Sequence, residues 1–245
     1  IVSCFIVPPD SAYIGYIDFN TLIMLFCLML IVEGMREQNL FQYIGGHILK
    51  RVHTGRSVVI TLVFLCFFGS MLITNDVSLI TFVPFGLMIL KMTGLTDRAC
   101  IVVVLMTIAA NLGSMFTPIG NPQNLYLYSL SGMNVGQLLW LMLPYTAAAA
   151  LLLLICIFLG APKSRLQIDE KPVRIKNVRR LYFYLFLFIL CLLTVAGILD
   201  HRILLVLVLV SILITRRLLL LRVDYPLLLT FIFFFIFTGN INRME

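Results

Sequence analysis

Charged side chains are scarce in this 245-residue sequence, and their scarcity excludes a soluble globular domain. Only 12% of the residues are Asp, Glu, Lys or Arg, whereas soluble domains carry about 25%. Hydrophobic residues reach 61%, and the mean hydropathy is +1.07. Unbroken apolar runs such as 203–215 do not match the short alternating strands of a membrane barrel. The sequence therefore predicts an integral, polytopic, all-α membrane protein.

Catalytic and metal-binding motifs are also missing. The sequence has no HExxH, no CxxC and no cluster of histidine with cysteine. The six cysteines are scattered singly in or beside apolar stretches, as small packing residues would be: Cys4, Cys27, Cys66, Cys100, Cys156 and Cys191. Asp76 has no second acidic residue as an evident intramembrane partner, so a catalytic dyad is not indicated. We expect a protein that is not an enzyme and that uses no cofactor other than a coupling ion.

The net charge of +7 does not indicate a nucleic-acid partner, because no RNA- or DNA-binding motif accompanies it. The basic residues lie in short loops between apolar spans, which is the usual bias toward cytoplasmic loops. The hydrophilic loop 163–180 is the clearest case, with seven Lys or Arg residues against Asp169 and Glu170. We assign this loop to the cytoplasm and the protein to the cytoplasmic (inner) membrane.

Apolar segments between polar turns divide the chain into an ordered series of predicted elements. Residues 1–162 form a first repeat, 163–180 the basic loop, and 181–245 the start of a second repeat. Within the first repeat we expect a helix at 18–34, an interfacial helix at 39–52, a re-entrant hairpin at 57–91, a broken helix at 99–130 and a helix at 137–160.

The hairpin follows from counting sides of the membrane. The segment 57–91 begins after the basic residues of 50–56 and ends at Lys91, so both of its ends belong to the cytoplasmic side. Its tip then falls at 74–76. With the loop 163–180 in the cytoplasm as well, one topology places every basic cluster inside.

Two similar segments indicate an inverted repeat. DFNTLIMLFCLMLIVEGMRE (18–37) resembles DYPLLLTFIFFFIFTGNINRME (224–245), and the topology gives the two copies opposite orientations. Opposite orientation is typical of inverted-repeat secondary transporters. The second copy is incomplete here, so we expect the sequence to be a fragment that would not transport alone.

Polar residues interrupt two apolar stretches at membrane depth, at SMLITND (70–76) and at NLGSMFTPIGNPQN (111–124). Irregular backbone is tolerated there only when it is buried in protein or lines a watery cavity. Broken helices expose N-terminal amides, which favour anions, and free carbonyls, which coordinate cations. The two breaks together therefore predict an ion and substrate site.

Two residues of the first break allow a second interpretation. The Ser70 hydroxyl could bond back to a carbonyl one turn earlier in its own helix. Asp76 could cap a helix that starts at Val77. However, an acid at the bilayer centre costs at least about 2.5 kcal/mol, and such residues are functional by default. Capping and ligand roles are compatible for this residue.

The two breaks resemble motifs of the ion transporter superfamily, which includes divalent anion/sodium symporters such as dicarboxylate and citrate carriers, arsenite efflux carriers and one class of sodium/proton antiporters. In the symporters a hairpin ends in Ser-Asn-Thr with a serine four residues earlier. SMLITND (70–76) matches that frame with Thr74 for Ser and Asp76 for Thr. TPIGNPQN (117–124) is similar to the stretch in the broken helix of the family. The likeness covers most of the chain.

The resemblance implies an elevator-type secondary carrier, usually a homodimer. One Na⁺ site would use Ser70, Thr74 and Asn75 together with backbone at Gly120. Asn75 and Thr117 would lie near the substrate anion. Asp76 departs from the symporter pattern, since a carboxylate adds negative charge to an anion site. It looks more like the arsenite-carrier and antiporter side of the superfamily, or a proton-coupled variant.

The expected function is secondary active transport of an anion, an inorganic oxyanion or a di- or tricarboxylate, coupled to Na⁺ or H⁺. Arsenite efflux or Na⁺/H⁺ antiport is the first alternative, and an uncoupled channel component is the second. Partners are a small anionic substrate, the lipid bilayer and a second copy of the chain. Substrate identity, stoichiometry and direction stay open. The candidate ion and substrate ligands are Ser70, Thr74, Asn75, Asp76, Asn111, Thr117, Gly120, Asn121 and Asn124.

Overall fold

The computed structural model describes residues 7–8, 10, 12–49, 52, 54–160 and 174–243, and these residues form an all-α protein. Most of the predicted cytoplasmic loop 163–180 lies outside them. Seven of the described helical segments are long and apolar enough to cross a membrane. This finding confirms the predicted class, a polytopic helical membrane protein. The division into inverted repeats stays a prediction.

The chain divides into two compact units, one made of 34–186 and the other of 1–33 with 187–245. The first holds α4 (Leu40–Leu49), α5 (Gly55–Leu72), α6 (Asn75–Met92), the short 3-10 helix η1 (Thr96–Arg98), α7 (Ala99–Ser114), α8 (Pro122–Ser131) and α9 (Val135–Gly160). The second holds α2 (Ala12–Tyr16), α11 (His201–Arg216), η2 (Arg217–Arg222) and α12 (Tyr225–Asn242). The chain passes between the units within α3 (Phe19–Glu37) and α10 (Val178–Val195).

Helices α5 and α6 form an antiparallel hairpin whose tip is only two residues long. Ile73 and Thr74 have extended backbone, with φ and ψ of −126° and 161° for Ile73, and of −60° and 150° for Thr74. The buried Ser78 hydroxyl of α6 donates to the carbonyl of Cys66 in α5 at 3.2 Å and so joins the two arms. Each arm has 18 residues, or about 27 Å, close to the hydrocarbon thickness of about 30 Å. The depth of the tip therefore depends on tilt, and the re-entrant assignment stays a prediction.

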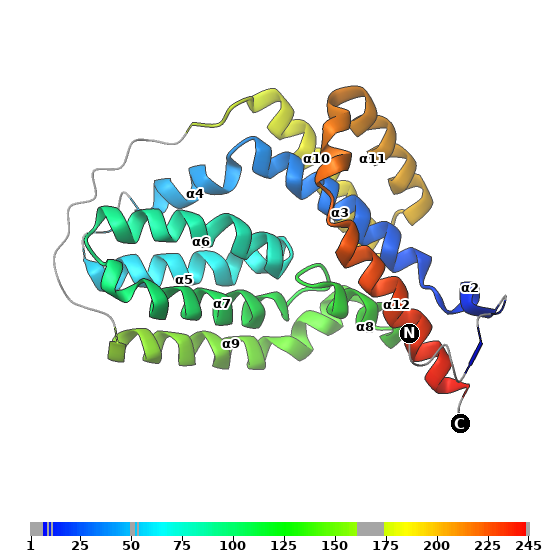
Figure 1. Ribbon diagram of the computed structural model, residues 1–245, viewed down its shortest axis with the longest axis horizontal. Coiled ribbons are helices and arrows are strands. Elements are labelled where there is room, and N and C mark those ends of the chain that lie inside the picture. Colours follow the sequence, from blue (N-terminus) through cyan, green and yellow to red (C-terminus); the bar gives the residue numbers. More distant parts are fainter. Residues whose placement is uncertain are drawn as a thin grey trace. The chain divides into compact units, whose positions relative to one another are not determined.

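Helix α7 packs against α5 through small residues. Ala109, Ala110 and Gly113 are buried on one face of α7, and an added Cβ at Gly113 would lie 2.1 Å from the carbonyl oxygen of Phe67. Two helices can bring their backbones this close only where a side chain is absent. Because Gly113 is next to the end of α7 and Phe67 is near the end of α5, the two helices end side by side (Figure 1).

Helix α9 returns along α7 to the end of the unit where α5 begins (Figure 1). Gly132, with φ of 64°, ends α8, and α9 then runs for 26 residues. The guanidinium of Arg56 donates to the carbonyl of Phe158 at 2.9 Å and lies 4.9 Å from the centre of its ring. This contact places the start of α5 and the end of α9 at the same end of the unit. The assignment of that end to the cytoplasm stays a prediction.

The two segments of the predicted repeat begin with the same local chemistry. The Asp18 carboxylate accepts hydrogen bonds from the amides of Asn20 and Thr21 at the start of α3. The Asp224 carboxylate accepts one from the amide of Leu227 at the start of α12, at 3.0 Å. An aspartate before the first turn satisfies amides that have no partner within the helix. The likeness between the segments thus includes a functional cap as well as apolar composition.

Candidate ion and substrate site

Four helix ends meet where the two predicted breaks lie. The backbone amide of Asn75, at the start of α6, donates to the carbonyl of Gly120 in the loop between α7 and α8, at 2.9 Å. In the opposite direction, the hydroxyl of Thr117 donates to the carbonyl of Met71, in the last turn of α5, at 2.6 Å. The two interruptions are therefore joined directly and form one structure.

A side-chain amide pair extends this contact toward the exposed side. The amide nitrogen of Asn75 donates to the Oδ1 atom of Asn111 at 3.0 Å, and the amide nitrogen of Asn111 donates to the carbonyl of Thr107 at 2.9 Å. Asn75 is half-buried, and Asn111 is exposed. The pair holds amide and carbonyl groups at the rim of the site.

The second break is held together by its own polar side chains. The side-chain oxygen of Asn121 accepts a hydrogen bond from the backbone amide of Asn124 at 2.7 Å and thereby caps α8. The side-chain amide of Asn121 donates to the Ser114 hydroxyl at 3.2 Å. The side-chain amide of Asn124 donates to the backbone carbonyls of Ser114 and Thr117, at 3.0 and 3.3 Å. These bonds satisfy carbonyls that the end of α7 leaves without helical partners. In this arrangement Asn121 and Asn124 shape the loop.

Gly120 is needed for space and not for an unusual backbone angle. Its φ lies outside the left-handed region, but an added Cβ would be 2.1 Å from the carbonyl oxygen of Ser114. A real Cβ could not be accommodated there without moving the backbone. The glycine thus lets the loop fold back on the end of α7 and present its carbonyl to Asn75.

Thr74 and Asp76 lie on either side of the amide contact. Thr74 is 3% exposed and precedes the first turn of α6, yet its hydroxyl makes no capping hydrogen bond. Asp76 is exposed and sits in the first turn, where the partial positive charge of a helix start favours a carboxylate. Because α6 begins at Asn75, the interpretation of Asp76 as the cap of a helix starting at Val77 is wrong.

Ser70 lies behind the break, in the packed layer between α5 and α7. It is fully buried, and its hydroxyl donates to the carbonyl of Phe67 at 2.9 Å. This is the bond to a carbonyl one turn earlier in the same helix, which the sequence analysis gave as the alternative to a ligand role. A hydroxyl that donates its hydrogen still has lone pairs with which to accept a bond or to bind a cation, so the bond does not exclude a ligand role.

The electrostatics of the site combine both signs. Through their aligned peptide dipoles, the ends of α5 and α7 carry partial negative charge and the starts of α6 and α8 carry partial positive charge, each about half an elementary charge. Among the described residues, no three His, Cys, Asp or Glu side chains gather as a transition-metal site would require. Hydroxyl, amide and carbonyl oxygens suit a hard cation such as Na⁺, and the amides suit an anion.

All nine predicted residues thus belong to the two breaks, in three different settings. Asn75, Asn111 and Thr117 form the junction, while Gly120, Asn121 and Asn124 shape the loop. Thr74, Asp76 and Ser70 are placed around the start of α6 and the end of α5. Sequence reasoning missed Gly113 and Ser78, which hold α7 and α6 against α5. The sequence does carry a signal for Gly113: Ala109 lies four positions before it, and two small residues at this spacing are typical of close contacts between membrane helices.

Comparisons with known proteins show the family to which the chain belongs. A family model described as citrate transporter matches residues 1–244. An uncharacterized transporter of Methanocaldococcus jannaschii is 35% identical over 93% of this chain, and the inner membrane protein YbiR of Escherichia coli K12 is 31% identical over 63%. A silicon efflux transporter of rice, Oryza sativa subsp. japonica, is 28% identical over 62%.

The chain spans 62%, 41% and 32% of the lengths of these three relatives, respectively. The relatives are described as transporters and membrane proteins, in agreement with the expected multi-pass membrane protein that is not an enzyme. With the family model matching nearly the whole sequence, the chain belongs to the citrate transporter family.

Proposed function

We propose that the whole protein is a secondary active transporter that moves a small anion across the membrane, coupled to Na⁺ or H⁺. The observation that carries this proposal is the direct bonding of the two breaks, by the Asn75 amide to Gly120 and the Thr117 hydroxyl to Met71. Two broken helices joined end to end are the typical setting of a transporter binding site.

The proposed division of labour follows the charges of the helix ends. A Na⁺ ion would bind near the ends of α5 and α7, through oxygens of Ser70, Thr74 and Asn75 and the backbone at Gly120. An anion would bind near the starts of α6 and α8, attracted by the positive ends of the two helix dipoles. The Asn75 side chain and the Thr117 hydroxyl would donate to it in exchange for their present bonds to Asn111 and Met71. Cation and anion would then neutralise each other in a medium of low dielectric constant, so that each binds better in the presence of the other.

The bonds between the breaks also support an elevator-type movement. The hairpin α5–α6 and the helices α7 and α8 share two hydrogen bonds at the site and the close contact at Gly113. A unit tied in this way would carry its bound solute as one body, and a homodimer would supply a fixed frame within the bilayer.

Transport by the full-length protein in sealed vesicles tests the proposal. With an imposed Na⁺ or H⁺ gradient, we expect radiolabelled citrate to accumulate above its external concentration. Movement of citrate, arsenite and Na⁺ only down their own gradients would indicate a channel. No response of any of these solutes to a cation gradient would contradict the coupled mechanism.

Asp76 supports a second candidate, efflux of arsenite or Na⁺/H⁺ antiport. Its exposed carboxylate at the start of α6 adds negative charge where the symporter reading needs an anion. A silicon efflux transporter among the relatives is a further reason to keep inorganic solute efflux.

The Asp76→Asn variant separates the two candidates. It keeps the size of the side chain and removes the titratable charge. We expect transport by this variant to lose its pH dependence if protons are the coupling ion. An unchanged pH profile from pH 5 to 8 would show that Asp76 is not the coupling group, and Na⁺ dependence would then be the remaining choice. Asp97→Asn, in η1 and away from the breaks, is the matched control.

A further inference from the structure

The Asn75–Asn111 pair fixes which atoms of the site donate hydrogen bonds and which accept them. The side-chain nitrogen of Asn111 donates to the carbonyl of Thr107 at 2.9 Å, one turn earlier in α7. Because a carbonyl only accepts, this bond leaves the Oδ1 atom of Asn111 to face Asn75. The side-chain nitrogen of Asn75 donates to that oxygen at 3.0 Å. Asn111 therefore presents a hydrogen-bond acceptor of fixed orientation at an exposed position of the site.

Binding of an anion would take the present donor away from this acceptor. In the proposed function the anion accepts hydrogen bonds from the Asn75 side chain and the Thr117 hydroxyl. Each exchange releases one acceptor, Oδ1 of Asn111 or the carbonyl of Met71. The Met71 carbonyl lies in the last turn of α5, at the negative helix end where the proposed Na⁺ would bind. An acceptor that loses its donor costs free energy, so a solute that brings a donor to Asn111 binds better.

Asp76 strengthens this preference for a donor. It is exposed in the first turn of α6, next to Asn75, and an ionised carboxylate only accepts hydrogen bonds. A carboxylate group of the solute at this position would meet an acceptor at Asn111 and a negative charge at Asp76. A hydroxyl group at the same position carries no charge and donates to either of them.

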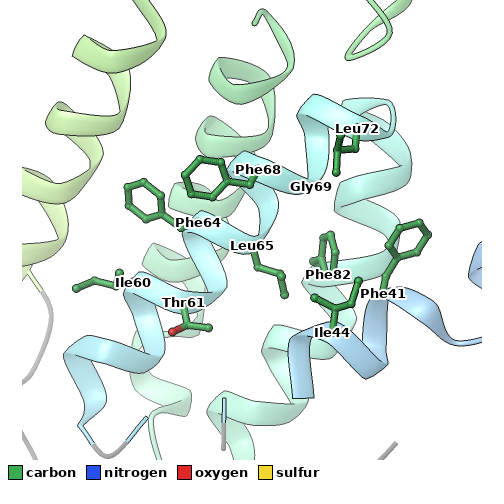
Figure 2. Close-up of a pocket in the computed structure, with 10 residues that line it drawn as sticks. All are labelled: Phe41, Ile44, Ile60, Thr61, Phe64, Leu65, Phe68, Gly69, Leu72 and Phe82. Atoms are coloured by element: carbon green, nitrogen blue, oxygen red, sulfur yellow. The ribbon is translucent and has the colours of Figure 1, made fainter. Parts of the chain in front are cut away.

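The face of α5 toward α4 is apolar by comparison. Figure 2 shows the groove on this face, and of the ten residues that line it only Thr61 has a polar side chain. An anion there would lose its hydration and gain few hydrogen bonds in return. The solute is therefore expected at the tip, beside Asn75 and Asn111.

We propose that Asn111 is a specificity-determining residue, whose Oδ1 atom accepts a hydrogen bond from a hydroxyl group of the solute. The site then selects anions that carry a hydroxyl group, such as a hydroxycarboxylate or a protonated oxyanion, over anions of similar shape that carry none. This inference rests on the proposed function, because it concerns the solute of the same site. It holds for uptake and for efflux alike, since it does not depend on the direction of transport.

Binding of matched solutes to the full-length protein tests the proposal. Three pairs differ by a hydroxyl group: citrate and tricarballylate, malate and succinate, and hydrogen phosphate and sulfate. Dissociation constants are measured by titration calorimetry in detergent, at neutral pH and in the presence of Na⁺. We expect the hydroxyl-bearing member of at least one pair to bind roughly tenfold more tightly than its partner.

Asn111→Leu should remove this difference, because leucine is of similar size and has no acceptor. If this variant does not fold, Asn111→Ala replaces it. The matched control is Gln123→Leu, which also changes an exposed amide to leucine within the second break and should keep the difference.

Each of the other outcomes overturns the proposal in a different way. Equal binding within every pair would contradict it and leave the proposed function in place. Binding of none of the six solutes would overturn the proposed function and this inference with it. A difference that survives in Asn111→Leu would place the acceptor at another residue. If Asn111→Leu weakened both members of a pair equally and raised the Na⁺ concentration needed for binding, Oδ1 would be a ligand of the cation instead.

Discussion

The two breaks of this chain are unequal, and the difference separates residues that hold the structure together from residues that can bind a ligand. The second break, between α7 and α8, binds itself: Ser114, Asn121 and Asn124 satisfy its carbonyls and cap its next helix. The first break, at the hairpin tip, is bonded to the second through the Asn75 amide and the Met71 carbonyl. The loop of the second break therefore acts as a scaffold, and we propose that the polar groups of the hairpin tip bind the ligand.

The largest effect is expected from closing the space that the scaffold requires. Gly120→Ala would place a Cβ 2.1 Å from the carbonyl oxygen of Ser114, so the loop must move and the bond to the Asn75 amide is lost. We expect a loss of about 3 kcal/mol in stability, measured as the thermal transition of the detergent-solubilised protein. Gly160→Ala is the control, since nothing lies within 4 Å of its added Cβ. Equal transitions for the two variants would contradict the scaffold role.

A smaller loss is expected from removing one side chain of the scaffold network. Asn124→Ala leaves the carbonyls of Ser114 and Thr117 without their side-chain donor. An unsatisfied buried acceptor costs about 1–3 kcal/mol, so stability should fall by about 2 kcal/mol and transport with it. Gln123→Ala, at the exposed neighbouring position, should match the parent protein in both measurements. Loss of transport at unchanged stability would instead make Asn124 a ligand.

Local signals in the sequence locate both breaks, because polar residues and prolines inside an apolar run are visible without a structure. Thr74, Asn75 and the stretch 117–124 were recognisable in this way. The unequal roles were not, since they depend on contacts between distant positions. Thr117 and Met71 are 46 positions apart, and the acceptor of the bond between them is a backbone carbonyl, which every residue has and which the sequence therefore cannot single out. Gly113 escaped notice for the same reason, because its role is a close approach to another helix.

At the tip itself, function should be lost before stability. Asn75→Ala removes one partly exposed amide bond, to Asn111, and keeps the backbone bond to Gly120, so stability should fall by about 1 kcal/mol or less. We expect transport to be abolished, because we propose that the amide is also a ligand. Asn111→Ala breaks the same side-chain bond from the other end. If the two single variants and the double variant lose transport equally, the amide acts only through that bond.

The smallest structural effect, and the sharpest test of the tip, is expected at Ser70. Its hydroxyl donates to Phe67 within the same helix, where such bonds add little, so Ser70→Ala should change stability by less than about 0.5 kcal/mol. If its lone pairs bind Na⁺, the Na⁺ concentration for half-maximal transport should rise by roughly tenfold. Ser78→Ala removes an equally buried hydroxyl, which donates to Cys66 across the hairpin and is not among the proposed ligands, and should leave the Na⁺ dependence unchanged. A similar Na⁺ dependence in both variants would place Ser70 with the packing residues, and the cation site would then rest on Thr74, Asn75 and the carbonyl ends of α5 and α7.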